Sequence, residues 1–209
     1  MKTYWQKIKG IVGPAYSKDF DKTGQQNTRS AIEKYITSVS DKHTRLLDAG
    51  CNTGIEGYRL LQNNFLGKYI GVDSNSKAIK MARENLKTDK KYEFFTQDLS
   101  DLKFSDEYFD IVLSKDVIEH HKYYEAIIHE LTRVTKKYLI LSMFIRPSIF
   151  FKDKIILHSD GYYLNKYNRK KLFDFIVKTG FKKPRTIYWN LQDEVFLFEK
   201  MSKLHFIHK

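Results

Sequence analysis

A short apolar segment that runs into a glycine turn, and then into a helix, is the feature that most constrains the fold. Arg45 to Ala49 predicts a buried strand, Gly50 to Gly54 a tight turn, and the apolar spacing that follows predicts a helix reaching Phe65. The same order returns at once, with a strand over Lys68 to Val72 and a helix over Ser76 to Leu86. Strands that alternate with helices in this way predict a parallel sheet covered by helices.

The alternation continues along the rest of the chain. Further strands are predicted at Tyr92–Gln97, Phe109–Ser114, Tyr138–Phe144, Arg185–Asn190 and Glu194–Glu199, and further helices at residues 27–42, Tyr123–Val134 and Asn168–Thr179. The last two strands are joined by a short turn, so they should form a hairpin in which one strand runs antiparallel to the rest. The predicted fold class is α/β, a Rossmann-like three-layer α/β/α sandwich with a mostly parallel seven-stranded sheet and an antiparallel strand in a C-terminal hairpin.

The length of 209 residues suits one domain that buries its own core. We expect residues 1–209 to form that single domain, with an N-terminal helical segment over residues 1–42. The regular pattern is interrupted over residues 145–166, which contain Pro147, Gly161 and several aromatic residues. This stretch is predicted to be an insert that serves as a lid or a substrate-binding segment.

Charge and composition limit the classes of function. The 37 Lys and Arg residues exceed the 25 Asp and Glu residues and give a net charge of +12, but they are scattered and mostly lysines, so a generally basic surface is favoured over a nucleic-acid footprint. No apolar run is long enough to cross a membrane or resembles a secretory signal, so a cytoplasmic protein is expected. The single cysteine, Cys51, excludes an internal disulfide and a cysteine-based structural zinc site.

Three features at the ends of predicted strands carry the chemistry. In the first turn, Gly50, Asn52 and Gly54 tolerate left-handed backbone conformations, which lets the chain pass close to a ligand at the start of a helix with unpaired N–H groups. Asp73 ends the second strand, where a carboxylate can accept hydrogen bonds from both hydroxyls of a ribose. Asp98 follows the third strand and could receive an adenine amino group. Open parallel sheets bind ligands at this edge.

In this order, the motifs resemble those of class I S-adenosylmethionine-dependent methyltransferases of the small-molecule type. The resemblance is carried by Leu46-Leu47-Asp48-Ala49-Gly50-Cys51-Asn52-Thr53-Gly54, Gly71-Val72-Asp73, Thr96-Gln97-Asp98-Leu99 and Phe109-Asp110-Ile111-Val112-Leu113-Ser114. It implies S-adenosyl-L-methionine as cofactor and S-adenosyl-L-homocysteine as product. The residues that it implies at the cofactor are Asp48, Gly50, Cys51 and Gly54 around the methionine part, Asp73 at the ribose, Asp98 and Leu99 at the adenine, and Asn52, Ser74 and Ser114 at the rest of the site.

A purely structural role stays open for several of these residues. Asp48 can orient the turn backbone instead of contacting the methionine amino group, Cys51 is expected to be a small packed residue, and Asp98 can cap the segment that follows it. The glycine turn and the ribose carboxylate also occur in nicotinamide oxidoreductases. Their phosphate-binding fingerprint, however, has a glycine where this chain has Asn52.

The segment after the fourth strand is a candidate for the acceptor side. Ser114-Lys115-Asp116-Val117-Ile118-Glu119-His120-His121 resembles a loop that carries Val-Ile-Glu-His in many methyltransferases. Lys115 and Asp116 are therefore predicted to help position the acceptor, and His120 to bind the acceptor or to cap or brace the cofactor pocket. We predict no metal site, because adjacent histidines diverge on a helix and no matched carboxylate and histidine pair is evident.

The insert supplies a second constellation, Leu157-His158-Ser159-Asp160-Gly161-Tyr162-Tyr163-Leu164-Asn165. His158 is the candidate general base, because an unperturbed imidazole titrates close to working pH. Tyr162 and Tyr163 are predicted to bind the acceptor, with packing of the lid onto the sheet as the alternative.

The sequence therefore predicts an enzyme, an S-adenosylmethionine-dependent methyltransferase that moves a methyl group to an oxygen or nitrogen atom of a small molecule, sugar or lipid-linked acceptor by in-line displacement. The segment Ser114-Lys115-Asp116-Val117 lacks the Asn/Asp-Pro-Pro-Tyr/Phe motif of enzymes that methylate exocyclic base amines. An RNA methyltransferase, supported by the basic charge, and a cofactor-binding partner subunit without catalysis stay open as alternatives.

Overall fold

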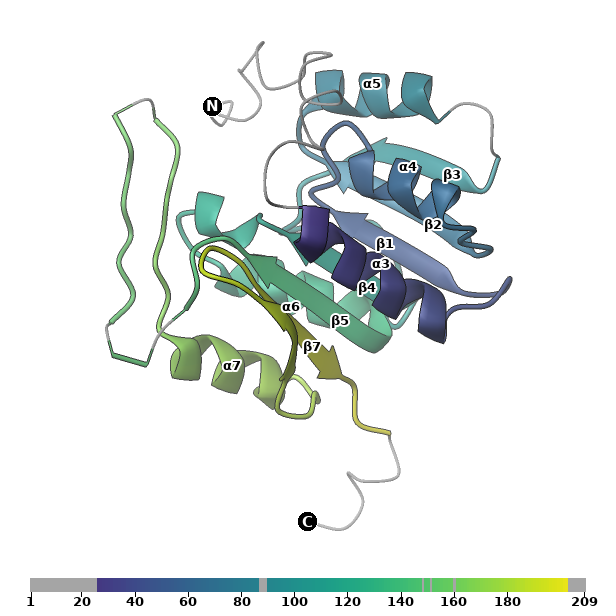
Figure 1. Ribbon diagram of the computed structural model, residues 1–209. Helices are drawn as coiled ribbons and strands as arrows, with labels where there is room; N and C mark the ends of the chain where they lie inside the picture. Colours follow the sequence, from purple (N-terminus) through teal and green to yellow (C-terminus); the bar gives the residue numbers. More distant parts are fainter. Residues whose placement is uncertain (1–25, 87–89, 148, 151, 160, 203–209) are drawn as a thin grey trace.

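The computed structural model describes residues 26–86, 90–147, 149–150, 152–159 and 161–202. In this part of the chain, seven strands form one sheet in the order β3-β2-β1-β4-β5-β7-β6 (Figure 1). The strands are β1 (Arg45–Ala49), β2 (Lys68–Asp73), β3 (Tyr92–Thr96), β4 (Phe109–Lys115), β5 (Thr135–Met143), β6 (Arg185–Trp189) and β7 (Glu194–Glu199). The helices are α3 (Gln26–Val39), α4 (Ile55–Gln62), α5 (Ser76–Asn85), α6 (Glu125–Val134) and α7 (Arg169–Lys178), with a short 3-10 helix, η2, at Ile118–His120.

Strand directions follow the prediction. The strands β3, β2, β1, β4 and β5 pair in parallel, and β7 pairs antiparallel with both β5 and β6. Because β7 lies between β5 and β6, the terminal hairpin extends the sheet at one edge (Figure 1). The mostly parallel sheet with an antiparallel strand in a C-terminal hairpin is confirmed.

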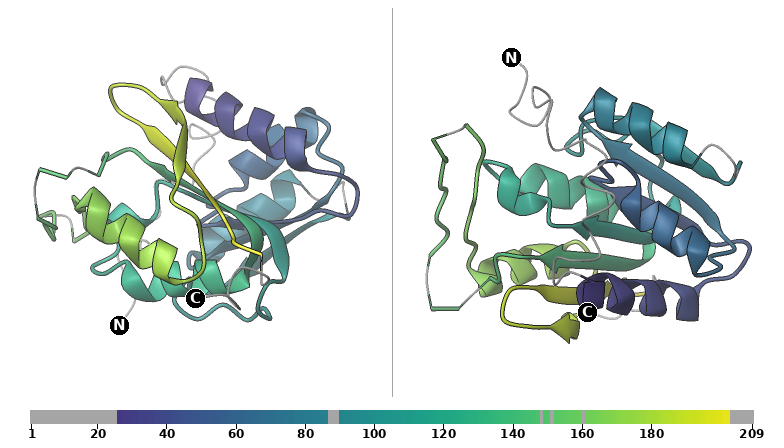
Figure 2. Two further views of the ribbon diagram at one scale, coloured as in Figure 1. Left: turned by 90° about the horizontal axis from the view of Figure 1, so that it is seen from below. Right: turned by 45° about the horizontal axis from the view of Figure 1, so that its top comes forward.

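Helices cover both faces of the sheet (Figure 1, Figure 2). Neighbouring residues of β1 demonstrate this, because Leu46 packs in a buried apolar cluster with residues of α3, α4 and α5, whereas Leu47 packs in a second cluster with residues of α6 and α7. A strand that is buried on both faces has a continuous apolar run, as in residues 111–113 of β4. The expected three-layer α/β/α sandwich is therefore confirmed.

Several element boundaries differ from the prediction, and the structure explains two of the larger differences. The helix expected to reach Phe65 ends at Gln62, because Asn64 adopts a left-handed conformation with a φ of 59° and the chain turns so that Phe65 is buried outside the helix. The fifth strand begins at Thr135 instead of Tyr138, since Thr135 already pairs with β4 before a register irregularity. Both differences arise from local backbone geometry that the apolar pattern does not encode.

The predicted insert, residues 145–166, leaves the carboxyl end of β5 and returns to α7 as two extended segments that stand beside the sheet (Figure 1, Figure 2). Isolated bridges join Lys154 to Lys166 and Leu157 to Tyr163 across the two segments. The insert is thus an antiparallel arm rather than a compact cap.

Of the N-terminal helical segment expected over residues 1–42, the structure describes α3 and the turn that follows it. Residues 1–25 lie outside the described residues. None of the described helices is both long and apolar enough to span a bilayer.

Candidate cofactor and acceptor site

The turn between β1 and α4 has the backbone conformation that the sequence predicts. Gly50, Asn52 and Gly54 have φ angles of 88°, 49° and 81°, in the left-handed region that glycine and asparagine tolerate best. The N–H groups of Gly50 and Cys51 donate to one carbonyl oxygen of β2 at 2.8 and 3.0 Å, which ties the turn to that strand. A Cβ atom at Gly50 would collide with the Val117 side chain. This position therefore needs glycine for its φ angle and for close packing.

Asp73, at the end of β2, is bound to the turns on both sides of it. Its Oδ2 accepts a hydrogen bond from the Asn52 N–H at 3.0 Å, and its Oδ1 accepts one from the Asn75 N–H at 2.8 Å. Burial raises the pKa of Asp73, and the N–H groups of Asn75, Asn52 and Ser74 oppose that shift. A carboxylate has about four acceptor sites. The group is therefore fixed beside the glycine turn with capacity left for a ligand hydroxyl.

Asp48, on β1 just before the turn, is buried and accepts a hydrogen bond from the Tyr69 hydroxyl of β2. Burial raises the pKa of Asp48 to about 6, while the Tyr69 bond and the nearby Arg29 and Lys115 charges act in the opposite direction. Tyr69 thus orients the carboxyl group, a role that the sequence motifs do not predict. The signal that could have found it is a tyrosine inside an apolar strand, because a buried hydroxyl needs a partner.

Two polar atoms near the turn are buried with no hydrogen-bond partner among the described residues. They are Asn52 Oδ1 and, at the carboxyl end of β4, Ser114 Oγ. Buried polar atoms in native proteins are normally bonded, so these two atoms fit a polar ligand at this edge. Cys51 differs, because its side chain is buried against Gly71 and burial raises the pKa of its thiol well above the ordinary value. These surroundings favour the interpretation of Cys51 as a packed residue.

Asp98 follows β3 and caps the turn after it. Its Oδ1 accepts hydrogen bonds from the Ser100 N–H at 2.9 Å and the Ser100 hydroxyl at 2.8 Å. Burial acts to raise the pKa of Asp98, but these two bonds and the nearby His121 outweigh it, so the pKa is lowered. Leu99 is only 5% exposed and belongs to the apolar cluster beneath α6 and α7. The capping role of Asp98 is therefore present, and Leu99 offers little free surface to a ring.

The segment after β4 is tightly held. Lys115 and Asp116 form an ion pair, and Asp116 has a φ of 56°, an uncommon conformation for a residue other than glycine. Glu119, for which the sequence motifs predict no role, is fully buried, and its Oε1 accepts a hydrogen bond from the Phe144 N–H at 3.1 Å. Burial, followed by the Asp116 charge, raises the pKa of Glu119. Glu119 therefore links η2 to the start of the insert.

The structure brings four of the acceptor-side candidates together. His120 Nδ1 lies 3.0 Å from the Tyr163 carbonyl oxygen, and the His120 ring centroid lies 6.3 Å from that of Tyr162. The His158 ring stacks on the Tyr162 ring, with centroids 4.5 Å apart. Burial lowers the pKa of His120, which favours the neutral imidazole, while the Tyr163 carbonyl and the Asp116 charge act against that shift. The tyrosine segment of the insert is thus packed against η2, with His158 beyond it.

Asn165, which is fully buried, anchors the return of the insert. Its amide group donates hydrogen bonds to the His121 carbonyl oxygen and the Tyr167 hydroxyl, and its Oδ1 accepts one from the Ile156 N–H at 2.9 Å. Its own N–H donates to the Glu119 carbonyl oxygen at 2.9 Å. Asn165 therefore joins both segments of the insert to the chain after β4.

The side chain of His121, the residue after His120, lies in the field of Asp98. Burial lowers the pKa of His121 to about 4, and Asp98 acts against that shift. Within the described ranges, no group of three or more His, Cys, Asp or Glu side chains could hold a metal ion.

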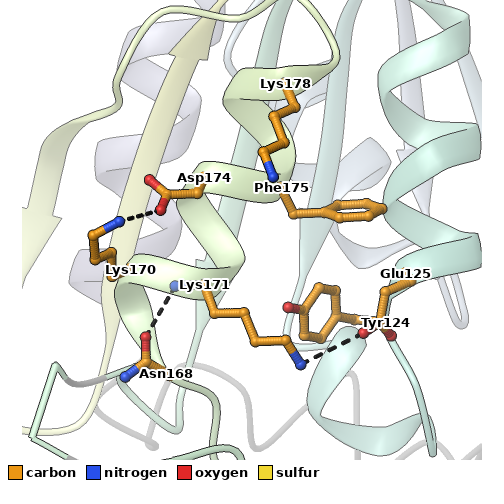
Figure 3. Close-up of a pocket in the computed structure, with 8 residues that line it drawn as sticks. All are labelled: Tyr124, Glu125, Asn168, Lys170, Lys171, Asp174, Phe175 and Lys178. Atoms are coloured by element: carbon orange, nitrogen blue, oxygen red, sulfur yellow. Dashed lines mark hydrogen bonds and ion pairs between the residues drawn. The ribbon is translucent and has the colours of Figure 1, made fainter.

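A cavity of about 1000 Å³ opens between the end of β5, the insert, the start of α7 and the β6–β7 turn. A smaller hollow of about 430 Å³ lies between α6 and α7 (Figure 3). In the smaller hollow, Lys170 pairs with Asp174, and Lys171 pairs with Glu125 at 3.7 Å. The larger cavity is therefore the better candidate for an acceptor, because it adjoins the carboxyl edge of the sheet and the smaller one is lined by helices.

Comparison with known proteins agrees with this geometry. Residues 47–141 match the methyltransferase domain family. Over this stretch, the sequence is therefore similar to that of a methyltransferase domain. No curated protein matches the sequence.

Solved structures, among them two methyltransferases, share the fold at low sequence identity. Magnesium protoporphyrin IX methyltransferase from Synechocystis, solved with bound S-adenosylmethionine, is 19% identical, with a TM-score of 0.65 over 95% of this chain and 90% of that chain. The 1,6-didemethyltoxoflavin-N1-methyltransferase from Burkholderia thailandensis is 14% identical, with a TM-score of 0.67 over 92% of this chain and 86% of that chain. The YcgJ protein from Bacillus subtilis is 15% identical, with a TM-score of 0.70 over 84% of this chain and 99% of that chain.

Proposed function

We propose that this methyltransferase binds S-adenosyl-L-methionine at the carboxyl ends of β1, β2 and β3 and transfers the methyl group to an oxygen or nitrogen atom of a small molecule, sugar or lipid-linked acceptor. The observation that carries the proposal is the Asp73 carboxylate, held by the Asn52 and Asn75 N–H groups beside the left-handed glycine turn. A fixed carboxylate next to closely approaching backbone suits a ribose and its neighbouring groups. Asn52 Oδ1 and Ser114 Oγ, which have no hydrogen-bond partner within the described part of the chain, offer further polar contacts.

Most of the predicted cofactor residues have a place in this proposal, whereas Leu99 is buried and has none. Asp48 and the turn over residues 50–54 would face the methionine part, Asp73 and Ser74 would bind the ribose, and Asp98 would receive the adenine amino group. The bound cofactor supplies an electrophilic methyl group on a sulfonium centre. The protein residues then orient the acceptor, exclude water and hold a proton, since positioning supplies most of the acceleration in such a transfer.

The acceptor would approach from the side of the insert. His120, Tyr162 and Tyr163 lie together there, and the Lys115–Asp116 ion pair holds the segment between β4 and η2 in place. Two of the similar structures are named for methylation of compact small molecules, magnesium protoporphyrin IX and 1,6-didemethyltoxoflavin, which supports a small-molecule acceptor for this chain.

Asp73→Ala tests cofactor binding. We expect it to weaken S-adenosylhomocysteine binding by about 100-fold in isothermal titration calorimetry, because two hydrogen bonds to a charged acceptor are lost. Asp73→Asn, which keeps the shape of the side chain, guards against a folding defect, and Asp101→Ala, an exposed carboxylate, is the control. Unchanged binding in both Asp73 variants would refute the assignment of Asp73 to the cofactor site.

Transfer of radiolabelled methyl groups into fractions of a host extract would sort the acceptor into small molecule, lipid, protein or RNA.

His158 is our candidate for accepting the proton of a hydroxyl acceptor. We expect His158→Ala to lower turnover by about 100-fold and to leave S-adenosylhomocysteine affinity unchanged, because the loss of a general base affects the transfer step alone. Lys154→Ala, on the same insert, is the matched control. A turnover within twofold of the unsubstituted enzyme would remove His158 from the mechanism.

A further inference from the structure

We propose that the cavity of about 1000 Å³ beside β5 binds an acceptor with an apolar body and an anionic group, a carboxylate or a phosphate. This inference rests on the proposed methyl transfer and names the class of substrate that it would use. Pockets of this size suit ligands of roughly drug size.

The apolar character of the cavity comes from exposed side chains that line it. Ile149, in the insert, is 61% exposed, and Leu191, in the β6–β7 turn, is 88% exposed. Large apolar side chains that gather around one cavity mark a binding site more often than a solvated surface. They would cover the apolar body of a ligand from two sides.

The charge of the cavity is carried by two cations, Arg146 and Lys166. Neither side chain has an ion pair or hydrogen bond among the described residues, although most charged neighbours do. The cavity residue Arg169 pairs with Glu194, and Asp193 accepts a hydrogen bond from the Thr28 hydroxyl at 2.7 Å. Three cations, Arg146, Lys166 and Arg169, line the cavity beside one carboxylate, Asp193. The excess charge stays positive even with Arg169 paired to Glu194, which favours an anionic ligand.

One wall of the cavity, Phe144, contacts the segment between β4 and η2 that lies beside the proposed cofactor site. Phe144 lines it, and the Phe144 ring centroid lies 5.4 Å from that of His120. The Phe144 N–H donates to Glu119, and Val117, at the start of the same segment, packs on Gly50. These contacts connect the cavity wall to the glycine turn, and the proposal places one end of the ligand towards that turn and its charged end at the cavity.

The test measures binding directly, with decanoate, decyl phosphate and 1-decanol as probes below their micelle thresholds in isothermal titration calorimetry. We expect the double variant Arg146→Gln and Lys166→Gln to raise the dissociation constants of decanoate and decyl phosphate by about tenfold and to leave that of decanol unchanged. A stronger effect on one anion than on the other would identify the preferred group. Lys154→Gln, which lies opposite Lys166 on the insert and does not line the cavity, should change nothing.

A second pair of variants tests the apolar contribution to ligand binding. Ile149→Ser should raise the dissociation constants of all three probes by about fivefold. Leu157→Ser removes an equally exposed side chain, also 61%, that does not line the cavity, and it should have no effect. All these side chains are exposed, so the variants are expected to fold.

Titration of S-adenosylhomocysteine into the same samples separates the two hypotheses. In one outcome, S-adenosylhomocysteine binds, and the anions bind equally well to the double variant and to the unsubstituted protein. The anionic-acceptor inference is then overturned while the proposed function stands. If the anions show the expected charge dependence but S-adenosylhomocysteine does not bind, the acceptor role fails together with the proposed function. Charge-dependent binding of the anions together with cofactor binding supports the inference.

Discussion

At the scale of single residues, Asp48 and Tyr69 form a pair whose chemistry is altered by folding. The carboxyl group is buried, it accepts a hydrogen bond from the Tyr69 hydroxyl, and its pKa is raised to about 6 because burial disfavours the charged form. The unfolded chain ionises this group near 3.8. Between these two pH values the folded protein holds a proton that the unfolded chain has released, so stability falls as the pH rises.

Replacement of Asp48 by asparagine should remove that pH dependence. Asparagine keeps an acceptor for Tyr69 and cannot ionise, so Asp48→Asn is expected to raise the free energy of unfolding by up to about 3 kcal/mol at pH 7.5 and by little at pH 3.5. Urea unfolding at the two pH values measures the difference. The exposed control Asp101→Asn should shift stability by less than about 0.5 kcal/mol at either pH. An equal effect of Asp48→Asn at both pH values would show that folding does not raise the pKa of Asp48.

At the scale of elements, the insert depends on few contacts. Its two extended segments share isolated bridges rather than a continuous ladder, and Asn165 and Glu119 supply the buried hydrogen bonds that hold its ends. Segments with few buried contacts open locally at a lower free energy than the core of a domain. The insert is therefore expected to be the first part of the described chain to open.

Asn165→Ala should release the insert before it unfolds the sheet. We expect tryptic cleavage after Lys152 and Lys154 to become about tenfold faster, because three side-chain hydrogen bonds of Asn165 are lost. Mass spectrometry of the first fragments in native buffer identifies the site. Asn190→Ala is the control, because it also removes an asparagine side chain that accepts backbone hydrogen bonds, but in the β6–β7 turn instead of the insert. First cuts elsewhere in the described part of the chain would contradict this account.

The elements also explain how far the sequence predicts the site. Gly50 and Asp73 end neighbouring parallel strands, so their spacing alone places them at one edge of the sheet. Tyr69 and Glu119 act on partners 21 and 25 residues away, through sheet register and through the path of the insert. No local pattern encodes such contacts. The early end of α4 depends on a single left-handed residue, Asn64, and apolar periodicity does not detect it.

At the scale of the whole molecule, the sheet separates two apolar clusters, and the terminal hairpin contributes to both. Val195 and Leu197 of β7 pack with the α3, α4 and α5 side, whereas Phe196 and Phe198 pack with the α6 and α7 side. The alternation follows from the two-residue period of a strand. β7 is therefore part of the core rather than an appendage at the edge.

Phe198→Ala should consequently destabilise the whole protein. Phe198 is fully buried, and its ring centroid lies 5.4 Å from that of Phe173, so we expect a loss of about 3 to 5 kcal/mol in urea unfolding. Trp189→Ala, in the adjacent strand β6, removes a larger side chain that is 65% exposed and should cost about 1 kcal/mol or less. Equal losses for the two variants would show that the hairpin does not form part of the core.

The position of β7 between β5 and β6 also affects how the chain reaches this fold. β7 pairs Met143 with Glu194 and Tyr138 with Glu199, which are 51 and 61 residues apart, so the sheet closes late and through a long loop. Until then, β5 presents an open backbone edge to other chains. Such an edge promotes aggregation of newly made protein. We therefore expect the yield of recombinant protein to rise with cooler expression and with chaperone supply, even where the purified protein is stable.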